Sequence, residues 1–441
     1  MFAIMKSSIV GFLTLNSILA NAASDSLGDV LSSQKNLSSF NELLTTQLTD
    51  LLDELERYDA EDDPITILAP SNRAFDMLPN VQTIGQAISD NNTAELENIM
   101  RYHVLSGIHS SQTLNSSFSF ETSLLTAKNF TSVTGGQRVG AVLQGGEPPQ
   151  IVFTSGQSTR SVVSKEDIAF KGGVIQQVDA FAIPPLPFVD TASSYNLANE
   201  PQAITSFLGA IYAQKNASLP RLLNTTKDVT IFAPVNVAFE IIRGSITSMP
   251  SKTLHDVLSY HVVPSSNDSI YSSDFANGTT LRTLQGNNLT MSFNSNSYFL
   301  NSARITTTDI LIANGVIHVI DNVLSPNVTT AMPNPTSFTQ APVLPTTGVS
   351  NFNSSMAPFT TFLPDYVPSS SSETATASNG ASASNGALYS VTGTRSATSS
   401  ASASQSSFSS SAARSPSGLG CERFILIVTI LAMFIGVSVV R

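Results

Sequence analysis

The sequence predicts an α+β fold, with two tandem domains that are each a β-sandwich flanked by helices, followed by a disordered Ser/Thr-rich stalk. Three observations predict this architecture. Three short motifs occur twice in the same order, each copy changes from helical to strand periodicity, and the C-terminal part of the chain is rich in Ser and Thr. The chain has 441 residues, enough for two or three domains of ordinary size.

The duplicated motifs define the two domains. The paired segments are Ile65–Phe75 with Val229–Phe239, Arg101–Val104 with Ser259–Val262, and Gly173–Asp179 with Gly315–Asp321. Their offset falls from 164 to 142 residues, so the first copy carries 22 residues more than the second. Gly135, Gly136, Gly145 and Gly146 mark the loops where most of this excess lies. A repeat of this length indicates a duplicated domain and not a solenoid.

Each copy begins with helices and ends with strands. Apolar residues at helical spacing open the first copy, at Leu27, Val30, Leu31, Phe40, Leu44, Leu48, Leu51 and Leu55. A short apolar strand then ends at Pro70 or Pro234, because proline lacks a hydrogen-bond donor. Ser71 or Asn72 is placed to cap the next helix. The β-branched runs 173–178 and 315–320 close the copies as buried strands, which makes the class α+β.

The two ends of the chain carry targeting signals. A short basic and apolar segment ending at Ala20-Asn21-Ala22 predicts a secretory signal peptide over 1–22. Ser411-Ala412-Ala413, a polar spacer and the apolar run 424–440 form the pattern of a glycosylphosphatidylinositol (GPI) signal, with Ser411 as attachment residue. A transmembrane helix over 424–440 is the alternative, although the run is short and lacks a basic flank.

These signals complete the predicted domain organisation. The boundaries are a signal peptide over 1–22, domains over 23–186 and 190–326, a stalk over 327–411 and a GPI-signal propeptide over 412–441. Residues 369–417 contain 20 Ser and 5 Thr, which leaves too few apolar residues to form a core, and the segment is therefore predicted to be disordered. Such a segment is typical of an O-glycosylated stalk.

Composition excludes several classes of protein. The 21 Lys and Arg against 32 Asp and Glu give a net charge of −11, which argues against nucleic acid as a partner. A single Cys excludes a disulfide framework and a Cys-rich zinc module. Only 12% of residues are charged, and N-linked sugar is the predicted source of solubility. The eleven acceptor sites are Asn36, Asn91, Asn115, Asn129, Asn216, Asn224, Asn267, Asn277, Asn288, Asn327 and Asn353.

The three paired motifs resemble the two conserved blocks and the intervening Tyr-His motif of the fasciclin (FAS1) family. The resemblance covers roughly residues 25–186 and 190–326. It implies compact wedges of packed sheets with flanking helices, in cell-surface or matrix proteins that take part in adhesion. Tandem domains with a signal peptide, a stalk and a GPI signal are similar to secreted fungal and plant members. Gln176 and Gln177 depart from the family pattern in the last strand of the first copy.

The Tyr-His pairs Tyr102-His103 and Tyr260-His261 are the candidate interaction residues. Each His falls on the apolar stripe of an amphipathic helix, at i+7 from Leu96 or Leu254, and its Tyr points about 100° away. One interpretation is a buried His hydrogen-bonded to backbone. The other, implied by the resemblance, is that the Tyr-His region contributes to partner contact.

No other residues predict catalysis, a metal or a cofactor. The five His residues lack the spacing of a zinc site, and no nucleophile elbow or phosphate loop is present. Gly135–Gly140 is predicted to be a loop between strands. The carboxylates Glu54, Glu56, Asp59 and 61–63 do not follow the order of a calcium loop and predict a solvated acidic turn.

The leading functional hypothesis is a GPI-anchored surface glycoprotein that mediates adhesion and is not an enzyme. The expected partners are other cell-surface or matrix proteins or wall glycans, with membrane attachment through the lipid anchor. The alternative is a transmembrane-anchored protein in the lumen of a vacuole or another endomembrane compartment that supports membrane traffic or fusion. A third hypothesis, a glycan-modifying enzyme, has only Asp179 and Asp321 as candidate residues.

Overall fold

A computed structural model describes residues 25–78, 82–198, 202–214, 218–265, 268–346 and 357–364. The predicted signal peptide, the C-terminal apolar run, Ser411 and the sequons at Asn216, Asn267 and Asn353 lie outside these residues. Both repeats belong to one compact unit of the chain, Met1–Gly393.

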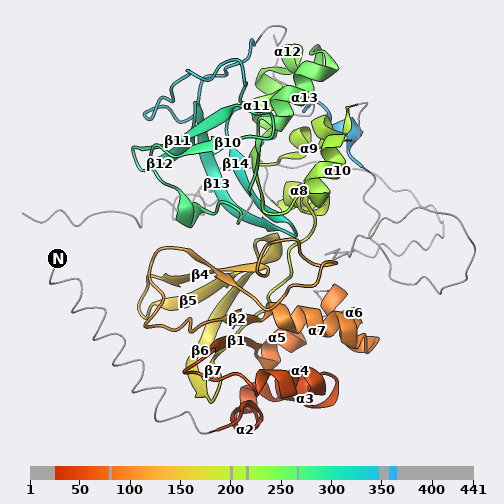
Figure 1. Ribbon diagram of the computed structural model, residues 1–441, viewed down its shortest axis with the longest axis vertical. Helices are drawn as coiled ribbons and strands as arrows, with labels where there is room; N and C mark the ends of the chain where they lie inside the picture. The colour runs from red at the N-terminus through yellow and green to blue at the C-terminus, as the bar shows by residue number, and fades with distance from the viewer. Residues whose placement is uncertain are drawn as a thin grey trace, which may run out of the picture. The chain divides into compact units, whose positions relative to one another are not determined.

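The first domain consists of N-terminal helices and one seven-stranded sheet (Figure 1). Its helices are α2 (Leu27–Ser33), η1 (Lys35–Leu37), α3 (Ser38–Thr46), α4 (Thr49–Leu55), α5 (Asn72–Asp76), α6 (Gln82–Ser89), α7 (Thr93–Tyr102) and η3 (Gly156–Ser158). Its strands are β1 (Ile65–Pro70), β2 (Val104–Ser106), β3 (Ser119–Thr122), β4 (Arg138–Gln144), β5 (Gln150–Thr154), β6 (Arg160–Phe170) and β7 (Gly173–Val178). The order in the sheet is β2-β1-β7-β6-β5-β4-β3.

The second domain repeats this plan. Its helices are α8 (Phe188–Ala198), α9 (Thr205–Tyr212), α10 (Ser218–Thr225), α11 (Asn236–Ile241), α12 (Arg243–Thr247), α13 (Ser251–Ser259) and η4 (Ser272–Asp274). Its strands are β8 (Val229–Pro234), β9 (Val262–Pro264), β10 (Thr280–Arg282), β11 (Asn288–Asn294), β12 (Ser297–Leu300), β13 (Ala303–Ile312) and β14 (Gly315–Ile320). The sheet order is β10-β11-β12-β13-β14-β8-β9, which is equivalent to that of the first domain.

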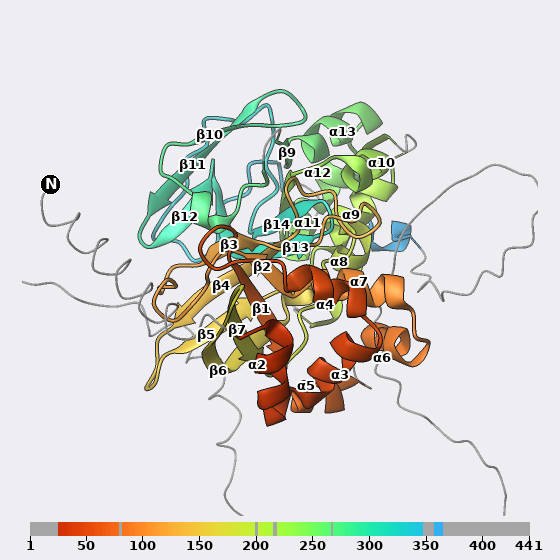
Figure 2. The same ribbon diagram turned by 60° about the horizontal axis from the view of Figure 1, so that its bottom comes forward.

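The sheet of each domain curls until it almost closes. In the first domain a bridge between Leu105 and Ser123 brings the two ends of the strand order together. The long strand β6 makes the bend possible, because its register with β7 shifts twice between Val163 and Ile168. Figure 2 shows β6 running from β5 to β7 in this curved sheet. The predicted α+β class, with helices that flank a β-sandwich, is confirmed. The two layers of each sandwich are parts of one continuous, curved sheet.

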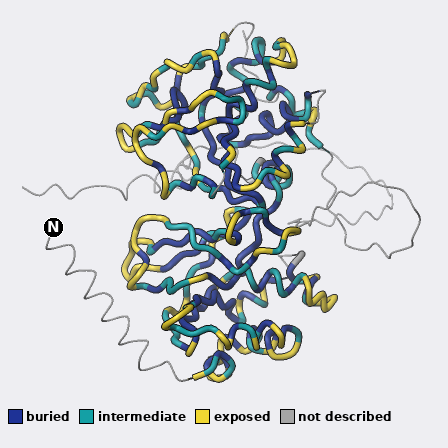
Figure 3. Tube along the Cα trace, in the orientation of Figure 1, coloured by how far each residue is buried: buried dark blue, intermediate teal, exposed yellow. Residues whose placement is uncertain are grey.

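Two parallel strands form the centre of each sheet. β1 pairs with β7, and β8 pairs with β14, so that the first and third duplicated motifs lie side by side. All four strands are buried along their whole length (Figure 3), as expected for the only parallel pairs in the described sheets. The predicted buried strands over 173–178 and 315–320 are therefore confirmed.

The predicted helical pattern of the first copy also supplies its core. Leu27, Phe40, Leu44, Leu51 and Leu55 are all buried in one apolar cluster with β1 and β7. Ser71, as predicted, is the N-cap of α5, where its hydroxyl accepts a hydrogen bond from the Ala74 N–H.

The loop before β4 is the main difference between the two copies. Residues 123–137 join β3 to β4, whereas only 283–287 join the equivalent strands β10 and β11, that is 15 residues against five. The predicted excess loop around Gly135 and Gly136 lies here, and Val139 and Gly140 already belong to β4.

This longer loop contacts the second domain. The Thr134 N–H and hydroxyl donate hydrogen bonds of 2.8 and 2.6 Å to the carboxylate of the buried Asp228. Arg138, directly after the loop, forms an ion pair with Asp268. The insertion therefore ties the two domains together by charge-assisted hydrogen bonds, which are stronger than neutral ones.

Packing of the second domain continues beyond Pro326, where the sequence predicts the start of the stalk. The Asn322 amide donates to the Ala341 carbonyl at 2.7 Å, and the Arg304 guanidinium donates to the Ser337 carbonyl at 2.7 Å. Further on, Phe359 packs against Phe239. A composition rich in Pro and Thr does not reveal these contacts, because they are made largely by backbone carbonyls.

One glycine in each domain makes the central parallel pair possible. A Cβ atom added at Gly173 would lie 2.0 Å from the Ile65 carbonyl oxygen, and one at Gly315 would lie 1.9 Å from that of Val229. Both glycines also have positive φ angles, of 146° and 159°. Only glycine allows the two backbones to approach this closely.

We therefore expect Gly315→Ala to destabilise the second domain. The added methyl group has to push β14 away from β8, and substitutions of this kind cost roughly 2–4 kcal/mol. Urea unfolding of the two proteins measures this difference. Gly145→Ala is the matched control, because nothing lies within 4 Å of its added Cβ and no positive φ is involved. Equal stability of Gly315→Ala and Gly145→Ala would contradict the prediction.

Candidate functional site

The Tyr-His motif closes the helix that precedes β2 or β9. Tyr102 is the last residue of α7 and His103 is its C-cap, while Tyr260 is the C-cap of α13 and His261 follows it. All four side chains are fully buried. In this fold they are inaccessible to a partner, which matches the interpretation of a buried, hydrogen-bonded His.

Each His connects its own helix to the first duplicated motif and to the segment that follows the third. The His103 Nδ1–H donates to the Ile99 carbonyl at 2.8 Å, and Nε2 accepts the Ala182 N–H at 2.9 Å. The His103 carbonyl also accepts the Leu68 N–H of β1 at 2.8 Å. Because the two ring nitrogens have opposite roles, the imidazole is neutral and in a single tautomer.

The second domain contains the same arrangement. His261 Nδ1 donates to the Val257 carbonyl at 2.8 Å, and Nε2 accepts the Leu324 N–H at 3.0 Å. The His261 carbonyl accepts the Phe232 N–H at 2.9 Å. The motif therefore has the same structural role in both copies.

Each Tyr connects the helix to the far part of the sheet. The Tyr102 hydroxyl donates to the Arg138 carbonyl at 2.9 Å, and the Tyr260 hydroxyl donates to the Asn288 carbonyl at 2.8 Å. On the helix each Tyr points about 100° away from the apolar stripe that carries its His, a direction that would lead away from the core. Instead it turns toward the start of β4 or β11, because the sheet curls around the end of the helix. Direct contact of these side chains with a partner does not fit their burial. An indirect contribution, in which the motif holds the surrounding surface in place for a partner, stays a prediction.

Burial controls the protonation of these side chains. Loss of hydration lowers the pKa of His103 and of His261 to about 4, and the hydrogen bond to the Ile99 or Val257 carbonyl opposes this only in part. Burial also raises the pKa of Tyr102 and of Tyr260. All four groups are neutral at physiological pH.

The carboxylates of the enzyme hypothesis are held by backbone groups. Asp179 accepts the Val162 N–H at 2.7 Å, and Asp321 accepts the Arg304 N–H at 2.8 Å. Each therefore fixes the start of its long strand, β6 or β13, against the end of the parallel pair. This structural role gives the enzyme hypothesis no support.

The two Asn residues after the Ala-Pro dipeptides act as caps, but for a different helix from their own. Asn72 accepts the Ser39 N–H at 3.0 Å at the start of α3, and Asn236 accepts the Ser206 N–H at 2.8 Å at the start of α9. The sequence shows that these Asn residues recur, but it does not show which helix they cap, because the contact spans at least 30 residues.

Gln176 has the same structural role as His318 in the second copy. The Gln176 side-chain oxygen accepts the Asp167 N–H at 3.0 Å, and His318 Nδ1 accepts the Asp309 N–H at 3.2 Å. Both Asp residues have positive φ angles, 56° and 63°, where the long strands bulge. The departure from the family pattern at Gln176 thus preserves a hydrogen bond that holds the bulge.

The acidic segment before β1 is mostly solvated, as predicted. Glu56 and residues 61–63 are exposed, whereas Glu54 lies against Arg101. The hydrogen bond from Arg101 lowers the pKa of Glu54. Within the ranges that the structure describes, no group of three His, Cys, Asp or Glu side chains is arranged to hold a metal ion.

The sequon asparagines lie at the surface, as some asparagines outside sequons do, such as Asn92 and Asn296. All eight that the structure describes are exposed, whereas Asn301, Asn314 and Asn322, which are outside sequons, are buried. The exposed set is Asn36, Asn91, Asn115, Asn129, Asn224, Asn277, Asn288 and Asn327. Their positions therefore allow glycan attachment without disturbing the core.

The buried His residues lead us to expect acid-sensitive stability. In the unfolded chain a His takes up a proton near pH 6.5, but folded His103 resists protonation until about pH 4. The free energy of unfolding should therefore fall by about 3 kcal/mol per histidine between pH 6.5 and pH 4. Urea unfolding of wild type and His103→Gln at several pH values measures this, and the variant should lose that part of the pH dependence.

Tyr102→Phe is the matched control for His103→Gln. It removes one hydrogen bond, at a cost of about 1 kcal/mol, without changing a group that titrates between pH 4 and 7. An unchanged pH dependence in His103→Gln, or a reduced one in Tyr102→Phe, would show that His103 is not the acid-sensitive group.

This chain is similar to several known proteins. The fasciclin domain profile matches residues 35–184 and 203–326. A fasciclin-like arabinogalactan protein of Arthroderma benhamiae is 30% identical over 315 residues, 70% of this chain and 69% of its own length, and a similarly named protein of Cercospora beticola is 30% identical over 70% of this chain and 78% of its own. A solved FAS1 domain pair from the insect cell adhesion molecule Fasciclin I is 17% identical, with a TM-score of 0.32 over 67% of this chain and 98% of that one.

These matches cover both copies of the repeat and more than half of the chain. None of the helices within the described ranges is both long enough and apolar enough to cross a bilayer. The chain belongs to the fasciclin family, with two tandem fasciclin domains, and it is an adhesion-type protein and not an enzyme.

Proposed function

We propose that this protein is a cell-surface glycoprotein that uses its two fasciclin domains to adhere to other cells, to wall material or to matrix. The observation that carries the proposal is a chain of two complete fasciclin domains whose described sequon asparagines all lie on the outside. The fungal relatives are named as fasciclin-like arabinogalactan proteins, which supports an extracellular location.

The structural roles of the buried polar residues support the same proposal. His103, His261, Asp179 and Asp321 are all engaged with backbone groups, so that their chemistry stabilises the fold. Function is then left to the outer surface, where weak contacts become effective when many copies act together.

Beads coated with the mature protein should bind cells or wall polymer more strongly than bare beads do. The measurement is the fraction of beads retained after washing, at several concentrations of salt and calcium. Beads coated with the acid-unfolded protein are the matched control, because they carry the same sugars without the folded domains. Equal retention of native-coated and unfolded-coated beads would contradict adhesion by the fasciclin domains.

We also propose that a GPI anchor at Ser411 attaches the protein to the outer leaflet of the plasma membrane. Phosphatidylinositol-specific phospholipase C should then release it from intact cells, and Ser411→Leu together with Ser410→Leu should abolish release by preventing attachment. Labelling with ethanolamine tests for an anchor that resists the enzyme. Retention without ethanolamine label would instead favour the membrane-spanning, vacuolar alternative.

A further inference from the structure

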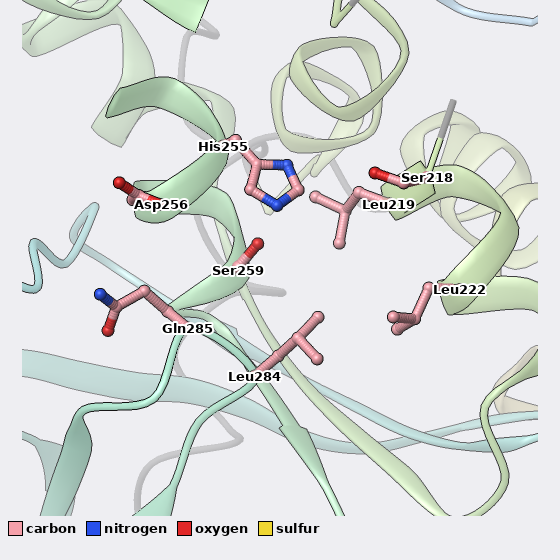
Figure 4. A pocket seen from close by; sticks show the side chains of 8 residues that line it. All are labelled: Ser218, Leu219, Leu222, His255, Asp256, Ser259, Leu284 and Gln285. Atoms are coloured by element: carbon pink, nitrogen blue, oxygen red, sulfur yellow. The ribbon is translucent and has the colours of Figure 1, made fainter. Parts of the chain in front are cut away.

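The second domain contains a small cavity. It has a volume of about 250 Å³ and lies between α10, α13 and the chain after β10. Figure 4 shows the side chains of Leu219, Leu284, His255 and Ser259 directed at a common space, while Asp256 and Gln285 point away from that space. The cavity therefore has an apolar side and a polar side.

Comparison of the two copies shows why the cavity exists. Ser259 stands where the first domain has Arg101, because both directly precede the Tyr-His pair, and His255 stands where it has Glu97. Helix α4 can be aligned with α10 by their buried leucines, so that Leu51 corresponds to Leu219 and Leu55 to Leu223. By that alignment Leu222 replaces Glu54.

These three positions form an ion cluster in the first domain. The Arg101 guanidinium contacts the Glu54 carboxylate at 2.6 Å and the Glu97 carboxylate at 2.9 Å. In the second domain the long guanidinium side chain and both carboxylates are absent, and a small hydroxyl, an imidazole and a leucine stand in their places. Because the second domain has no Arg side chain at position 259, space is left between the two helices. Because it has no carboxylates at positions 222 and 255, those positions add no negative charge to this space.

Two polar side chains line the cavity, Ser259 and His255. Ser259 is only 2% exposed, and its hydroxyl has no hydrogen-bond partner within the described part of the chain. His255 Nδ1 donates to the Gln214 side-chain oxygen at 2.9 Å, which leaves Nε2 as an acceptor. A buried hydroxyl without a partner costs free energy, so a ligand that bonded to Ser259 would recover it.

The residues around the cavity indicate the class of the ligand. Leu219, Leu222 and Leu284 suit a face of C–H groups, while Ser259 and His255 suit hydroxyl groups. A cation fits poorly, because the two carboxylates that hold the guanidinium in the first domain have been replaced. The volume is below the roughly 300–1,000 Å³ of sites for drug-sized ligands, so the ligand is about one ring in size.

We propose that this cavity binds a single neutral sugar ring. The sugar is either free in solution or the terminal residue of a glycan. This inference rests on the proposed adhesion for its biological meaning, since a sugar site would give the second domain a contact with wall or surface glycans. The first domain, with its ion cluster in the same place, does not bind sugar in this way.

Sugar binding can be measured by NMR titration of the full chain after enzymatic removal of its own N-linked glycans. Glucose, galactose and mannose are titrated first, followed by short oligosaccharides that end in the best of them. We expect a Kd on the order of 1 mM for one monosaccharide, as is usual for a ligand with so few atoms. An oligosaccharide that binds more tightly would identify a glycan end as the source, and equal affinity would identify the free sugar.

Restoring the ion cluster of the first domain provides the decisive variant. Leu222→Glu, His255→Glu and Ser259→Arg together should close the cavity and weaken binding at least tenfold. Thr308→Arg, at an exposed position on β13 outside the cavity, is the matched control and should bind like wild type. Should the triple variant fail to fold, Ser259→Val, which removes the hydroxyl and fills part of the space, should still weaken binding several-fold.

Absence of binding by any of the sugars, or binding that these cavity variants leave unchanged, would overturn the proposal. The bead assay separates this result from the proposed function. Beads that adhere although no sugar binds would refute the cavity and leave adhesion standing. Sugar binding by a protein whose beads do not adhere would refute adhesion and leave the cavity standing.

Discussion

The parallel pairing of β1 with β7, and of β8 with β14, is the constraint on which the rest of each domain depends. It brings together two motifs that are about 100 residues apart in the first copy, and Gly173 or Gly315 allows the backbones to approach closely enough. The Tyr-His motif then connects β1 to the segment after β7, because His103 bonds to Leu68 of β1 and to Ala182 beyond β7. The duplicated motifs are therefore one structural unit, which explains why all three recur together.

Much of this unit can be predicted from the sequence. The periodicity of Leu27 to Leu55, the apolar strands and the Ser71 cap depend on neighbouring residues, and each was recognisable from local spacing. The burial of Tyr102 cannot be recognised from local spacing, because it depends on how far the sheet curls around α7. Likewise, the packing of Ala341 against Asn322 depends on the path of a Pro-rich segment, which apolar periodicity does not reveal.

The same distinction applies to the candidate site. The sequence identifies the Tyr-His motif because it is repeated, but repetition indicates a shared structural role at least as well as a shared function. In both copies the His has two equivalent backbone partners, and its low pKa follows from burial. A residue that does the same thing in two diverged copies is therefore explained most simply by the fold.

Functional differences between the domains are better sought where the two copies diverge. The loop 123–137 and the exchange of Arg101 for Ser259 are two such places, and both lie outside the central strands. The loop contacts Asp228 and so serves the domain pair. The exchange instead leaves a buried hydroxyl without a partner, which is unfavourable for a domain that has only to be stable. Position 259 is therefore where the two copies diverge in both charge and packing, and the proposed sugar site follows from that divergence.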